Sequence, residues 1–79
     1  MAGKLPVEPP AVWPQPDGAP VSCIEKLKML RENHEELAQS MQDAFEDAVL
    51  MGVDAEFMRQ LLARMVEGLS TPRRTQGPD

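Results

Sequence analysis

Cysteine and aromatic residues are scarce in this chain of 79 residues. Cys23 is the only cysteine, there is no tyrosine, and one tryptophan and two phenylalanines make up the aromatic residues. A single cysteine cannot form a disulfide within the chain, which favours a reducing, cytoplasmic location. So short a chain buries only a modest core, and chains of this size often depend on a partner for stability.

Long hydrophobic runs and a basic surplus are also missing. The longest apolar run, "AVLMGV", is far shorter than the roughly 20 residues that cross a bilayer. The opening "MAGKLPVEPP" lacks the apolar centre of a secretory signal, so we expect a cytoplasmic protein with no membrane association. The formal charge of −5 disfavours DNA as a partner without excluding it, because phosphate binding requires cations.

Proline divides the chain into three segments. Residues 1–21 hold six prolines and predict a stiff, extended arm without secondary structure. Residues 22–69 contain no proline and carry nearly all of the apolar periodicity. Residues 70–79 are polar and predict a disordered tail. We therefore expect a flexible Pro-rich arm, one helical domain and a flexible tail.

The central segment predicts a long first helix from about Cys23 to about Met51. Ser22 and Glu25 have the spacing of a capping box, which places Ser22 at the N-cap. Apolar residues follow in alternating steps of three and four, as in a coiled coil, and Ile24, Ala38 and Phe45 widen this stripe on one flank. The stripe comprises Leu27, Leu30, His34, Leu37, Met41, Ala44, Ala48 and Met51.

The stretch "MGVDAEF" predicts the end of this helix and the start of another. Gly52 can adopt the left-handed conformation that ends a helix, and Asp54 can cap the next one. The second helix is expected at about 55–67, with Gly68 as its end. A loop this short brings the second helix back along the first, so the predicted fold is an all-α helical hairpin.

No catalytic constellation is evident, and we expect neither an enzyme nor a bound cofactor. The carboxylates lie mostly off the apolar stripe, as on a solvated face. Cys23 has no second thiol nearby. His34 would bind a metal only if association brought several copies together, and a polar residue that sets helix register is the simpler interpretation, so we expect no metal.

The most specific expectation is binding of a protein. Methionine is frequent on surfaces that accept partners, and a tryptophan held by prolines is a typical anchor. Trp13 is expected to dock either on its own hairpin or on a partner, with "PDG" at 16–18 forming a turn. The function predicted is a non-enzymatic interaction or accessory protein that self-associates or docks on a larger protein. Its expected binding residues are Trp13, Leu27, Leu30, His34, Leu37, Met41, Phe45, Met51, Phe57 and Met58.

The span from Ile24 to about Val66 resembles the GapR-like family of small helical bacterial nucleoid proteins. "IEKLKMLRENHEEL" is similar to the opening stretch of that family. The resemblance implies an oligomer that surrounds DNA through basic side chains, of which Arg59 is present and Arg64 lies one residue out of place. A basic surface of the assembled oligomer formed by Arg59, Arg64, Arg73 and Arg74 would favour DNA as the partner. Further matches are Met41, Asp43, Phe45, Asp47, Ala48, Gly52, Asp54, Met58 and Arg59, whereas basic positions of the family hold Gln42, Val49, Glu56, Gln60, Ala63 and Val66.

A second resemblance is to NepR-type anti-sigma factors, which also place two helices between flexible arms. This resemblance implies a regulator that wraps around a sigma factor or around the protein that controls it. The pattern is followed by Leu37, Met41, Phe45, Val49, Val53 and Phe57, with Leu61 and Leu62 one residue late.

Overall fold

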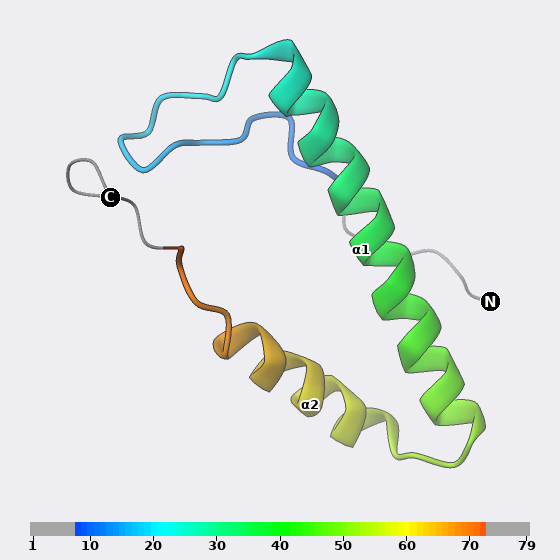
Figure 1. Ribbon diagram of the computed structural model, residues 1–79. Coiled ribbons are helices and arrows are strands. Elements are labelled where there is room, and N and C mark those ends of the chain that lie inside the picture. The colour runs from blue at the N-terminus through cyan, green and yellow to red at the C-terminus, as the bar shows by residue number, and fades with distance from the viewer. Residues whose placement is uncertain (1–7, 73–79) are drawn as a thin grey trace.

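Two α-helices joined by a short turn form a helical hairpin in the computed structural model, which describes residues 8–72 (Figure 1). Helix α1 spans Ile24–Leu50 and helix α2 spans Ala55–Glu67. The predicted all-α hairpin is confirmed, and the helix ends lie within about one residue of those expected from the sequence. Residues 1–7 of the arm and 73–79 of the tail lie outside the described residues.

Helix α1 begins one residue later than the capping box predicts. Cys23 is the N-cap, with extended dihedral angles of φ −68° and ψ 123°. The backbone amide of Leu27 donates to the Cys23 carbonyl at 2.9 Å, which makes Cys23 the first residue of the hydrogen-bonded helix. The Cys23 side chain makes no capping hydrogen bond. The prediction of Ser22 as the cap is therefore wrong, although Glu25 still places a negative charge in the positive first turn.

The turn between the helices follows the sequence prediction closely. Gly52 has φ +104°, in the left-handed region that glycine adopts without strain. Its amide donates to the Val49 carbonyl at 3.0 Å, and the Val53 amide donates to the Ala48 carbonyl at 2.9 Å. These two bonds form a Schellman motif, which satisfies carbonyls left open at the end of α1.

Asp54 starts the second helix immediately after this motif. Its carboxylate accepts a hydrogen bond from the Phe57 amide at 2.8 Å, as an N-cap residue does. Helix α2 then runs to Glu67, and Gly68 follows it as the C-cap with φ −82°. Termination of α1 and initiation of α2 thus take only residues 51–54, which folds α2 back beside the C-terminal part of α1 (Figure 1).

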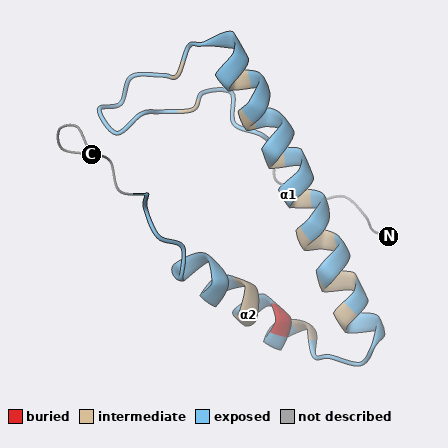
Figure 2. Cartoon of the chain, in the orientation of Figure 1, coloured by how far each residue is buried: buried red, intermediate tan, exposed pale blue. Residues whose placement is uncertain are grey.

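The hairpin buries very little of its apolar surface. Among the described residues only Met58, on the first turns of α2, is buried, at 9 % exposure (Figure 2). The two helices diverge from the turn, so the far end of α2 stands away from α1 (Figure 1). The half-buried side chains of α1 follow one line, with the polar Gln42 and Glu46 half-buried beside it. The line comprises Leu27, Leu30, His34, Ala38, Met41, Phe45 and Ala48.

This line departs from the predicted heptad stripe in the second half of α1. Ala38 and Phe45 lie on it, whereas Leu37 and Met51 are exposed, at 61 % and 80 %. A straight α-helix drifts by about 20° per heptad against a strict seven-residue repeat. Along α1, the heptad positions therefore turn gradually away from the side that α2 and the arm cover. The positions that have turned away form a second apolar face, which is exposed.

We expect the turn glycine to matter for stability and the terminal glycine not to. Replacing Gly52 by alanine forces a side chain into the left-handed region, which costs roughly 1–2 kcal/mol. Gly68→Ala is the matched control, because Gly68 has an ordinary helical φ and its added methyl group would meet backbone oxygens at 3.6 Å. Urea unfolding followed by circular dichroism should show a loss for Gly52→Ala alone. Equal stability of the two variants would contradict the role of Gly52.

Candidate functional site

The proline-rich arm closes into a tight hairpin-like loop. The Gly18 amide donates to the Gln15 carbonyl at 2.8 Å, and the Gln15 amide donates to the Ala19 carbonyl at 2.8 Å. Pro16 presets the dihedral angle of the first turn position, and Gly18 takes φ +92°. A turn followed by a left-handed glycine is a common three-residue hairpin connection. The turn predicted at "PDG" is confirmed.

Side chains and further backbone bonds hold this loop together. The Asp17 carboxylate accepts from the Ala19 amide at 2.9 Å, and the Gln15 side-chain amide donates to the Ala19 carbonyl at 3.2 Å. At the open end, the Val21 amide donates to the Trp13 carbonyl at 2.8 Å. The loop thereby fixes the backbone of Trp13 next to the start of α1.

Trp13 lies against its own hairpin. Its ring and that of His34 are 6.4 Å apart between centroids and inclined by 80°, an edge-to-face arrangement that aromatic pairs favour. Trp13 is half-buried, and its indole Nε1 is shielded from solvent without a hydrogen-bond partner in the described part of the chain. Of the two docking modes left open by the sequence, the structure shows the one on the same chain.

A second cluster joins the helices near the turn. The Arg59 guanidinium lies over the Phe45 ring, 5.1 Å from its centroid, and pairs with the Glu56 carboxylate at 3.7 Å. A cation over an aromatic face contributes roughly 0.5–1 kcal/mol at exposed sites. Together with the buried Met58, this cluster holds the first turns of α2 against α1.

The expected binding residues therefore separate into two groups. Leu37, Met51 and Phe57 are exposed and available to a partner. The others are buried or half-buried within the hairpin and its arm, namely Trp13, Leu27, Leu30, His34, Met41, Phe45 and Met58. Both groups include residues of the apolar stripe. Which of these residues are exposed depends on the side of α1 that α2 and the arm cover.

An exposed apolar surface at the end of α2 was missed from the sequence. Met65, Val66 and Leu69 are 61 %, 58 % and 78 % exposed. Met65 and Val66 lie three and four residues after the half-buried Leu62, which places these three on one side of α2, and Leu69 follows the end of the helix. This spacing was visible in the sequence. Their exposure follows from the divergence of the two helices, which no local signal specifies.

Cys23 is exposed at the start of α1. The backbone amides of Lys26 and Glu25 lower the pKa of its thiol, with a smaller contribution from the Lys26 charge, although neither amide reaches capping geometry.

Within residues 8–72, no three histidine, cysteine or acidic side chains gather where they could hold a metal ion. The helices described here include none with the length and apolar character needed to cross a bilayer.

The residues expected to contact DNA do not form one described basic surface. Arg59 is engaged with Phe45 and Glu56, as above. Arg64 lies in the last turn of α2, where a cation complements the helix dipole. Arg73 and Arg74 lie outside the described residues.

Comparisons with known proteins give no relative from which a role could be transferred. No family model matches the chain, and neither the curated proteins nor the solved structures contain a significant match.

We expect binding to duplex DNA to be weak or undetectable at about 0.15 M salt. Affinity for DNA depends on cations that neutralise phosphates, and one of the candidate arginines is already paired within the hairpin. Fluorescence anisotropy with a labelled duplex measures this directly. Tight, salt-sensitive binding that Arg59→Gln and Arg64→Gln weaken would contradict the expectation and favour a nucleoid role.

We expect Trp13→Ala to destabilise the folded chain by about 1–2 kcal/mol. This is less than the 3–5 kcal/mol typical of a fully buried aromatic, because Trp13 is only half-buried. Val12→Ala is the matched control, since Val12 is the neighbouring arm residue and is 55 % exposed. Urea unfolding should separate the two variants. A water-exposed tryptophan fluorescence spectrum in the isolated protein, with no loss of stability on truncation, would contradict docking on α1.

Proposed function

We propose that this chain is a non-enzymatic helical interaction protein that self-associates or docks on a larger protein. The observation that supports this most is the imbalance between buried and exposed apolar side chains. Met58 is the only large apolar residue buried within residues 8–72, whereas long apolar side chains are exposed on both helices. Apolar surfaces of this kind mark interaction sites when they are contiguous.

Each helix carries exposed apolar side chains at helical spacing. Met65 and Val66 continue the side of α2 on which the buried Met58 lies, and with Leu69 just after the helix they are exposed. On α1, Leu37 and Met51 belong to a regular repeat, separate from the half-buried line. Each face has the width and spacing that a partner helix would cover.

The structure also indicates which substitutions test binding without disturbing the fold. Met41 is the obvious target in the predicted stripe, but it is half-buried, so a lysine there would affect folding and association together. Met65 is 61 % exposed on α2 and makes a cleaner probe.

We expect Met65→Lys to weaken association, because it places a charge in the centre of the exposed face of α2. Ala63→Lys is the matched control: it adds the same charge on the same helix, at an exposed position on the other side. Sedimentation at micromolar concentration and quantitative affinity isolation from the native cell measure self-association and partner binding. The proposal fails if the wild-type chain is monomeric and captures no protein whose yield Met65→Lys alone reduces.

A further inference from the structure

Within residues 8–72, one face of α1 is covered by neither α2 nor the described part of the arm, and it repeats in regular steps of four and three residues. Leu37, Ala44 and Met51 are its exposed apolar positions, and the half-buried Leu30 lies at its edge. We call it the open face. It comprises Lys26, Leu30, Asn33, Leu37, Ser40, Ala44, Asp47 and Met51. Such a repeat, sustained over the length of a helix, is typical of a helix–helix contact.

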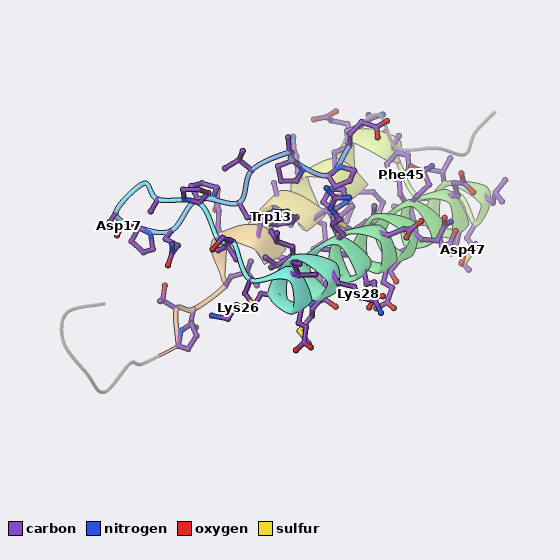
Figure 3. All side chains as sticks on the ribbon, turned by 90° about the horizontal axis from the view of Figure 1, so that it is seen from above. Trp13, Asp17, Lys26, Lys28, Phe45 and Asp47 are labelled. Carbon is purple, nitrogen blue, oxygen red and sulfur yellow. The ribbon has the colours of Figure 1, made fainter. Side chains whose placement is uncertain are left out.

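Apart from Glu25 in the first turn, the charges of α1 are separated along its axis. Lys26, Lys28 and Arg31 lie in its first third, and no lysine or arginine follows before Arg59. The Lys, Arg, Asp and Glu side chains in the remainder of α1 are all acidic. They are Glu32, Glu35, Glu36, Asp43, Glu46 and Asp47. Figure 3 shows Lys26 and Lys28 at one end of α1 and Asp47 at the other.

Glu25 is favourable next to the helix dipole, whereas the other charges at the two ends oppose it. Cations at the N-terminal end and anions at the C-terminal end are each unfavourable next to the dipole charge of the same sign. Helix α1 has no basic residue in its last turn. Within residues 8–72, Lys26 and Asp47 form no ion pair with another side chain. A second helix running in the opposite direction would bring the complementary charges to both ends.

We propose that the open face binds a second copy of this chain, with the two α1 helices antiparallel and crossing near Leu37. This inference rests on the proposed interaction function and identifies the partner as the chain itself. In this register Leu37 packs on Leu37 of the second copy, and Leu30 packs opposite Ala44 of the second copy. Lys26 lies beside Asp47 of the second copy, and the two-fold axis repeats that pair.

The face is self-complementary, which is what a two-fold interface requires. Leu30 and Ala44 lie at equal distances on either side of Leu37, with a lysine near one end of the face and an aspartate near the other. Ser40 and Ala44 are small enough to let the two backbones approach closely. An unrelated partner would need no such symmetry between the two ends of one helix.

A charge exchange tests the proposed register. Lys26→Glu and Asp47→Lys should each raise the dimer dissociation constant about tenfold, since each turns two symmetric attractions into repulsions. The double variant Lys26→Glu, Asp47→Lys should return close to wild-type affinity, because the exchanged pair forms again. Lys28→Glu is the control, with the same charge change away from the open face, and should have a smaller effect.

The single native cysteine tests the direction of the helices. In the antiparallel dimer the two Cys23 residues lie roughly 42 Å apart, at 1.5 Å per residue from position 23 to position 51. Wild-type protein should therefore not form a disulfide-linked dimer under mild oxidation. In Met51→Cys, by contrast, Cys23 of each copy meets position 51 of the other, and a covalent dimer should form. Rapid linkage of the wild type through Cys23 would show a parallel arrangement and overturn the proposal.

The proposal also fails if the double charge variant associates no better than the single ones, or if Leu37→Asp leaves a dimer intact while circular dichroism shows unchanged helicity. These outcomes are distinguishable from failure of the proposed function. A larger protein bound through α2 would still be captured by the Leu37→Asp variant and lost in Met65→Lys.

Discussion

The chain reversal at residues 51–54 is the constraint on which the rest of the structure depends. Gly52 ends α1 in a left-handed conformation, and Asp54 caps α2 two residues later. So short a turn places α2 beside the last turns of α1. It buries Met58 and brings Arg59 over Phe45. Because the helices then diverge, the same turn also leaves the far end of α2 exposed (Figure 1).

The sequence predicts best where structure is determined locally. The ends of both helices follow from single residues such as Gly52 and Asp54, whose conformation or side-chain hydrogen bond acts within one turn. The turn at 16–18 is predictable for the same reason. The N-cap shows the limit of such signals: a serine and a glutamate have the spacing of a capping box, yet the first helical hydrogen bond starts at Cys23. Capping preferences contribute only about 1 kcal/mol, and neighbouring contacts override them.

The candidate binding surface is less predictable, because it depends on which side of a helix the rest of the chain covers. Leu37 and Phe45 both belong to the broad apolar stripe of α1, but Phe45 lies under Arg59 and Leu37 is exposed. No composition or spacing rule separates them. The docking of Trp13 on His34 has the same character, since the sequence predicts an anchor without predicting its site. The spacing of the apolar face of α2 is visible in the sequence, whereas the crossing of the helices decides how much stays open.

Helix α1 thus has two different faces. One face supports the chain itself: it contacts Trp13 of the arm through His34 and packs against α2 through Phe45. Side-chain bonds from Gln39 to Asp43 and from Gln42 to Glu46 support the helix locally, each by a few tenths of a kcal/mol. These contacts leave the unfavourable placement of charge against the dipole uncorrected. An antiparallel copy on the other face would place opposite charges beside both ends, so the charge pattern that is unfavourable in the isolated helix would stabilise the proposed pair.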